Sequence, residues 1–126
     1  MSTRTCQRIF KQIRKEDIKQ GYFSQPVNPL VCEAYDYFDV VKFPMDLSTV
    51  HVRLDDGTYA KDMNMFISDM FLIFSNAIRY NPASHPVHQE AIKLKDLLCN
   101  QIEKEMKYEA DINSIFTLCT LKHAPI

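Results

Sequence analysis

Apolar residues recur every three or four positions in four separate stretches of the chain, which is the spacing of an amphipathic α-helix. The first stretch spans about residues 5–20 and stops before Gly21, a residue favoured just past the end of a helix. The last begins near Val87 and continues for about twenty residues. No strand-like alternation and no internal repeat is found. The pattern therefore predicts an all-α fold of four helices.

The two middle helices have clear boundary signals. Asp46 is suited to be the N-cap of a helix of about ten residues, which the Asp56-Gly57 turn would close. The next helix is predicted over roughly residues 60–80, and it ends at Asn81-Pro82 because the residue before a proline disfavours the helical region. The expected core stripes are Leu47, Val50 and Leu54 on the shorter helix and Phe66, Met70, Ile73, Phe74 and Ala77 on the longer one.

A long connection separates the first helix from the second. From Gly21 to Met45 the chain contains Pro26, Pro29 and Pro44 and has no long periodicity. This predicts a loop with one short helical turn near residues 36–41. A loop of this length within a compact domain is usually functional, so binding residues are expected here.

Length and composition indicate one globular domain. The chain has 126 residues, of which 46% are hydrophobic and 25% charged, values typical of soluble domains. We assign residues 1–110 to the domain and residues 111–126 to a C-terminal tail or an extension of the last helix. Neither a membrane-spanning run nor the apolar segment of a secretory signal is apparent, so we expect a soluble intracellular protein without membrane contact.

The net charge of −1 gives no broad reason for the chain to bind nucleic acid. A local group of cations does occur in the first predicted helix, at helical spacing. We interpret it as a solvated helix face. The group comprises Lys11, Arg14, Lys15 and Lys19.

The sequence indicates no metal site, no cofactor and no catalytic site. His85 and His88 are three residues apart, but no cysteine stands at ligand spacing and Glu90 is the only close carboxylate. There is also no nucleophile-and-base motif and no glycine-rich phosphate loop. The chain is therefore not expected to be an enzyme, although a longer parent protein could be catalytic. The cysteines are expected to be reduced and mostly packed, and they are Cys6, Cys32, Cys99 and Cys119.

Four sequence blocks, in order and at similar spacing, resemble the bromodomain family. They are residues 23–27 (FSQPV), 37–47 (YFDVVKFPMDL), 53–59 (RLDDGTY) and 76–82 (NAIRYNP). The similarity extends from about Phe10 to Met106. It implies a left-handed four-helix bundle with a long loop between the first and second helices, and a site that reads acetylated lysine.

The resemblance also implies which residues form that site. Asn81 would donate a side-chain N–H to the acetyl carbonyl oxygen, and Tyr37 would reach the same oxygen through a water molecule. An ammonium group placed in such an apolar slot would lose its hydration, so unmodified lysine should be rejected. The remaining pocket positions are Val27, Cys32 and Ala34 in the first loop, Phe23 in the floor, Tyr80 of the Tyr-Asn motif, and Val87 as the gate.

The chain departs from the family pattern at two places. Many members have Trp-Pro-Phe where this chain has Gly21-Tyr22-Phe23, so the aromatic shelf is either absent or supplied by Tyr22. Cys32 and Ala34 are small where many members carry leucine or a branched apolar residue. We hypothesise a wider and less apolar channel than usual.

The function that the resemblance implies is recognition of acetyl-lysine on histone tails or other acetylated nuclear proteins, by a monomer located in the nucleus. The alternative is a helical interaction scaffold that keeps the fold without binding acetyl-lysine. The presence of Asn81 and Tyr37 counts against this alternative. Peptide preference is expected to depend on rim residues, namely Tyr22, Glu33, Tyr35 and His85.

Overall fold

Four long helices and one short helix make up the described part of the chain. The structure is a computed structural model that describes the backbone of residues 1–122 and the side chains of residues 1–110. No strand occurs within these bounds. The helices are α1 (Thr3–Asp17), α2 (Tyr37–Val40), α3 (Leu47–Asp55), α4 (Met63–Tyr80) and α5 (Pro86–Lys122).

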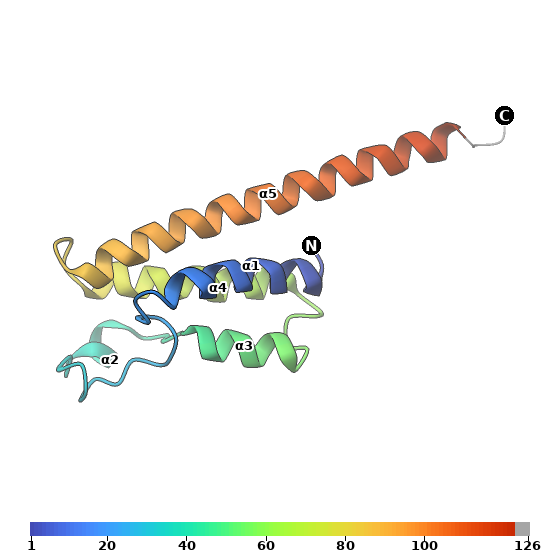
Figure 1. The fold of residues 1–126 in the computed structure, drawn as a ribbon. Helices are drawn as coiled ribbons and strands as arrows, with labels where there is room; N and C mark the ends of the chain where they lie inside the picture. The colour runs from blue at the N-terminus through green and yellow to red at the C-terminus, as the bar shows by residue number, and fades with distance from the viewer. Residues whose placement is uncertain (123–126) are drawn as a thin grey trace.

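The four long helices form a bundle. α5 packs against α4 and α1, and α3 packs against the same two helices on the other side. Figure 1 accordingly shows α1 and α4 between α5 and α3. The predicted all-α bundle is confirmed, and so are both predicted core stripes. The buried apolar core comprises Cys6, Ile9, Phe10 and Ile13 of α1, Phe23 of the first loop, Leu47, Val50 and Leu54 of α3, Tyr59 of the α3–α4 link, Phe66, Met70, Ile73, Phe74 and Ala77 of α4, and Ala91, Leu94, Leu98 and Ile102 of α5.

Side-chain caps determine where three of the helices begin. The Asp46 carboxylate accepts hydrogen bonds from the backbone N–H groups of Ser48 and Thr49, as predicted for the start of α3. Asp62 caps α4 in the same way, so this helix begins at Met63 and not near residue 60. The Ser2 hydroxyl caps α1, which therefore begins two residues before the predicted start.

Asp17 ends α1 and attaches the following loop to the bundle. Its side chain is completely buried and accepts hydrogen bonds from the Phe23 N–H (3.1 Å) and the Ser24 hydroxyl (2.7 Å). Gly21 adopts a φ of +74° and donates its N–H to the Asp17 carbonyl oxygen at 2.6 Å. This left-handed conformation suits glycine. The helix consequently ends three residues before the predicted Gln20, and Phe23 is directed into the core.

α5 is longer than the predicted helix of about twenty residues, since it has 37. In the described backbone the helix continues without interruption through Lys122. Its C-terminal part extends past the N-terminal end of α1 (Figure 1). The predicted domain boundary falls inside this helix, and the assignment of residues 1–110 to the domain stays a prediction. The side chain of Cys119 lies outside the described residues.

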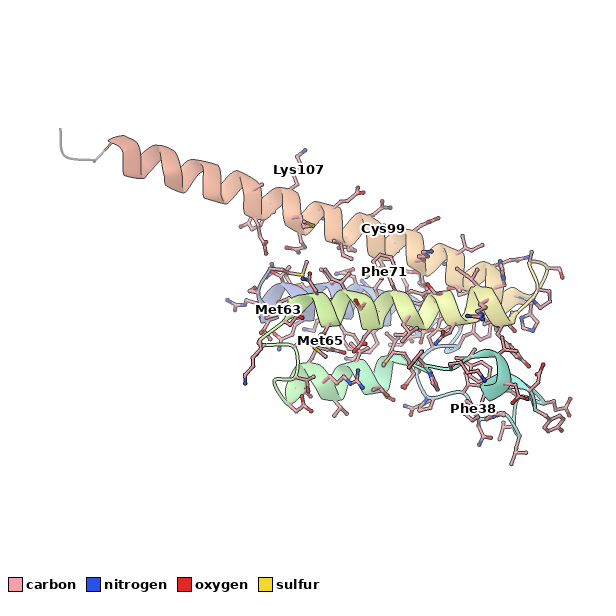
Figure 2. The ribbon with its side chains drawn as sticks, turned by 180° about the vertical axis from the view of Figure 1, so that it is seen from behind. Phe38, Met63, Met65, Phe71, Cys99 and Lys107 are labelled. Carbon is pink, nitrogen blue, oxygen red and sulfur yellow. The ribbon has the colours of Figure 1, made fainter. Side chains whose placement is uncertain are left out.

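The connection between α1 and α3 lies at one end of the bundle. It contains the predicted short helical turn, α2, and it lies at the same end as the link between α4 and α5 (Figures 1 and 2). The long α1–α3 connection and the link that follows Asn81 are therefore at the same end of the bundle. Within these residues no helix is both long enough and apolar enough to cross a bilayer.

Candidate functional site

Two tyrosines join α2 to the C-terminal end of α4. The rings of Tyr37 and Tyr80 meet edge to face, with their centroids 4.9 Å apart. The Tyr80 hydroxyl also donates a hydrogen bond to Asp36, one residue before α2, at 2.5 Å. These contacts fix the short helix against the end of the bundle, and they bring together two of the predicted site residues.

Tyr37 is positioned as a buried hydrogen-bond donor. Its side chain is only 6% exposed. Burial raises the pKa of the Tyr37 phenol above its ordinary value, and the nearby Cys32 thiol raises this pKa further. The hydroxyl is thus protonated at neutral pH and able to donate.

Asn81 is the C-cap of α4, where the chain leaves the helix. Its side-chain NH₂ donates to the Ala77 carbonyl oxygen at 3.1 Å, and its backbone N–H donates to the same oxygen at 3.0 Å. An NH₂ group carries two hydrogens, and this contact uses one of them. Pro82 then prevents the helix from continuing. The amide is therefore held at the end of the bundle by a rigid helix.

The link after Asn81 is held by the two histidines. His88 on α5 places Nδ1 2.7 Å from the Asn81 carbonyl oxygen. His85 is exposed, and its Nδ1 accepts a hydrogen bond from the Val87 N–H at 3.1 Å. Both imidazoles thus serve the local geometry of the link. In the described part of the chain no group of three potential metal ligands occurs.

The candidate pocket positions differ in their exposure. Phe23 and Tyr37 are buried, Val27, Ala34, Tyr80, Asn81 and Val87 are half-buried, and Cys32 is exposed. The expectation that the cysteines are mostly packed is therefore wrong for Cys32, because it lies in a loop turn outside the core; Cys6 is buried and Cys99 half-buried. Among the side chains of residues 1–110, no hydrogen bond joins Asn81 to Tyr37 or to the first-loop positions.

The shelf region contains two aromatic residues. Phe23 packs edge-on against Phe74 of α4, with ring centroids 5.3 Å apart. Tyr22 meets Phe23 in the same manner at 6.2 Å and remains 37% exposed. An aromatic side chain is thus present beside Phe23, partly open to solvent.

Asn76 is a positioning residue that was not predicted from the sequence. It lies on the buried side of α4, and its side-chain NH₂ donates to the Phe43 carbonyl oxygen in the α1–α3 connection at 2.8 Å. The hydrogen bond attaches the end of that connection to the helix that carries Asn81. A polar residue next to the apolar stripe of α4 was the available signal.

Exposed apolar side chains gather in the same connection. Phe38, which contacts the Tyr37 ring, is 52% exposed and projects at the α2 end of the molecule (Figure 2). Exposed apolar side chains grouped in this way mark interaction surfaces. Apart from Tyr35, this group was not predicted from the sequence; it comprises Leu30, Val31, Tyr35, Phe38 and Phe43.

Comparison with known proteins identifies the family. The bromodomain family model matches residues 6–93, more than half of the chain. The chain belongs to the bromodomain family. Bromodomains are modules that generally read acetyl-lysine, and they are not enzymes.

Named relatives of this bromodomain occur in two yeasts. It is 36% identical over 108 residues to the SWR1 complex bromodomain subunit bdf1 of Schizosaccharomyces pombe, covering 84% of this chain and 18% of the relative. It is 40% identical over 94 residues to the bromodomain-containing protein C631.02 of the same yeast (73% and 13%). It is 36% identical over 120 residues to bromodomain-containing factor 2 of Saccharomyces cerevisiae (86% and 19%). The chain spans less than a fifth of the length of each.

Proposed function

We propose that this bromodomain binds acetylated lysine in histone tails or other acetylated nuclear proteins, at the end of the bundle where α2 meets the C-terminus of α4. The observation that carries the proposal is the position of Asn81. Its amide stands at a rigid helix end, and one of its two N–H hydrogens is engaged by Ala77. The second is suited to donate to an acetyl carbonyl oxygen.

The proposed pocket takes its other groups from the same end of the bundle. Tyr37 supplies the buried hydroxyl that would hold a bridging water molecule. Phe23 forms the floor, Val27, Cys32 and Ala34 line the loop side, and Tyr80 and Val87 complete the site. The placement of Tyr22 favours the alternative in which it supplies the aromatic shelf.

Selectivity for the acetylated form follows from desolvation. An acetamide is neutral and finds its hydrogen-bond partners in Asn81 and a water molecule. A lysine ammonium would have to leave water for an apolar slot, at a cost of several kcal/mol. The exposed apolar residues of the α1–α3 connection would contact the peptide on either side of the modified lysine.

We also propose where this protein is located and in what form it binds. Two of its relatives bear names that identify a SWR1 complex subunit and a bromodomain-containing factor, and we infer a nuclear location for this chain as well. We further propose that it binds as a monomer and without direct contact to nucleic acid.

The test is a calorimetric titration of the domain with acetylated and unmodified histone-tail peptides. Asn81→Ala should weaken binding of the acetylated peptide by about 1–3 kcal/mol, or about 5- to 150-fold, because it removes the one direct hydrogen-bond donor to the acetyl oxygen. Asn81→Asp, which keeps the side-chain shape but lacks the N–H donors, should have a similar effect.

Asn100→Ala is the matched control, since Asn100 is exposed on α5 and should bind like the parent. Circular dichroism would establish that each variant is folded. A folded Asn81→Ala that binds the acetylated peptide with unchanged affinity would contradict the proposed contact. Failure of the parent to bind any acetylated peptide would favour the scaffold alternative.

A further inference from the structure

A hollow of about 330 Å³ lies between α1 and α3. Arg4, Lys11 and Arg14 line it from α1, and His51 and Asp55 line it from α3. None of the candidate acetyl-lysine residues contributes to it. We call this hollow the α1–α3 groove.

The floor of the α1–α3 groove is apolar and aromatic. Phe10 and Leu54 form it, and both belong to the buried core. The Phe10 ring stacks on His51 with centroids 5.6 Å apart, and the Arg14 guanidinium lies 5.5 Å from the centroid of Phe10. The Phe10 ring is thus contacted from both α3 and α1. The volume of the α1–α3 groove falls within the range of small binding pockets.

Some of the cations in the groove have an acidic partner and others do not. Arg8 pairs with Glu105 at 2.9 Å, and His51 pairs with Asp55 at 3.3 Å. Among the side chains described, no carboxylate oxygen lies within 4 Å of Arg4, Lys11 or Arg14. One wall therefore presents three cations without an acidic partner.

This arrangement changes the interpretation of the cations in α1. The sequence alone suggested one solvated face for Lys11, Arg14, Lys15 and Lys19. In the structure Lys11 and Arg14 line the groove, Lys19 pairs with Glu16 at 3.0 Å, and Lys15 is exposed outside the groove. The cationic face of α1 is therefore divided between the α1–α3 groove and the open solvent.

We propose that the α1–α3 groove binds an acidic peptide segment in which carboxylates flank an apolar side chain. The carboxylates would pair with Arg4, Lys11 and Arg14, and the apolar side chain would rest on Phe10 and Leu54. Charge complementarity of this kind directs both encounter and specificity. The proposal does not depend on acetyl-lysine binding, because none of the candidate acetyl-lysine residues lines the groove.

The groove favours a peptide over nucleic acid. Its floor offers apolar contact that a phosphate backbone does not use, and Asp55 would repel a continuous polyanion. The net charge of −1 also lacks the broad positive surface that nucleic acid binding requires.

The experiment measures fluorescence anisotropy of a labelled synthetic peptide in which one Phe is flanked on both sides by Glu residues. Lys11→Glu should weaken its binding about tenfold, because the new carboxylate repels the peptide inside the groove. Lys15→Glu makes the same change of charge four residues further along α1 and outside the groove, and should weaken binding clearly less than Lys11→Glu does, because its carboxylate does not line the hollow. Both lysines are exposed, so both variants should fold, and circular dichroism checks this.

Three results would overturn the proposal. Equal losses in Lys11→Glu and Lys15→Glu would mean that overall charge alone governs binding. Equal affinity for a control peptide with Ser in place of Phe would mean that the apolar floor is not used. Tighter binding of a double-stranded DNA oligonucleotide, with the same dependence on Lys11, would assign the groove to nucleic acid.

Discussion

Cys6 and Cys32 are expected to differ in reactivity, because one is buried and the other is exposed. Cys6 is fully buried in α1, with its thiol 3.6 Å from the sulfur atoms of Met1 and Met63. Burial raises the pKa of Cys6 to about 11. Cys32 is exposed in the loop that precedes Tyr37. The thiolate is the reactive form, so Cys6 should be inert where Cys32 is accessible.

Alkylation at pH 8 should therefore mark Cys32 well before Cys6. With a pKa of about 11, roughly one Cys6 thiol in a thousand is ionised at that pH. The proposed site adds a second expectation, that a saturating acetylated peptide slows labelling of Cys32. Peptide mapping by mass spectrometry measures both, with Cys32→Ser as the control. Labelling of Cys6 at the rate of Cys32 would contradict the burial argument.

The residues of the candidate site were easier to predict from the sequence than the contacts that hold them in place. Asn81 and Tyr37 were nominated because their sequence blocks resemble those of the family. The hydrogen bonds that position the surrounding backbone were not predictable, since Tyr80 and Asp36 are 44 residues apart and Asn76 and Phe43 are 33 apart. Such pairings depend on how the helices pack, which local spacing does not determine.

Among the elements, the loop between α1 and α3 is held in place by hydrogen bonds at its two ends. Asp17 holds its start through Phe23 and Ser24, and Asn76 holds its end through Phe43. The start of α3 was predicted from its Asp46 cap, whereas the Ser2 and Asp62 caps were not recognised and the starts of α1 and α4 were misplaced by two to three residues. The length of α5 was not predicted, because the apolar spacing after residue 110 suits a continued helix as well as a separate turn.

Asp17→Asn should lower the free energy of unfolding by about 2 kcal/mol. The amide offers one acceptor oxygen where the carboxylate offers two, and a buried donor is left unpaired. Urea denaturation measures the loss. Asp96→Asn, an exposed position on α5, is the control and should be within about 0.5 kcal/mol of the parent. Equal stability of the two variants would show that the loop anchor contributes little.

In the whole molecule, α1 and α4 form the centre of the bundle, because they contact each other and each also contacts both α3 and α5. The buried apolar side chains of this core come from residues 6–102. The proposed domain of residues 1–110 thus contains the core and the candidate site. The segment after it adds helix length to α5 beyond the end of α1.

Removal of residues 111–126 should leave a folded bundle. The melting temperature is expected to fall by no more than about 4 °C, the effect of roughly 1 kcal/mol or less in a domain of this size. Affinity for an acetylated peptide should be unchanged, because the candidate site lies at the opposite end of α5. Thermal denaturation and calorimetric titration measure the two quantities. A truncated chain that fails to fold would refute the boundary at residue 110.

The continuity of α5 has a mechanical consequence. At 1.5 Å per residue, its 37 residues form a rod about 56 Å long that begins beside Asn81. A flexible linker would let the two ends of such a segment drift independently. A single unbroken helix instead sets both the distance and the direction between them, so whatever contacts the far end of α5 stands at a fixed offset from the proposed peptide site at its beginning.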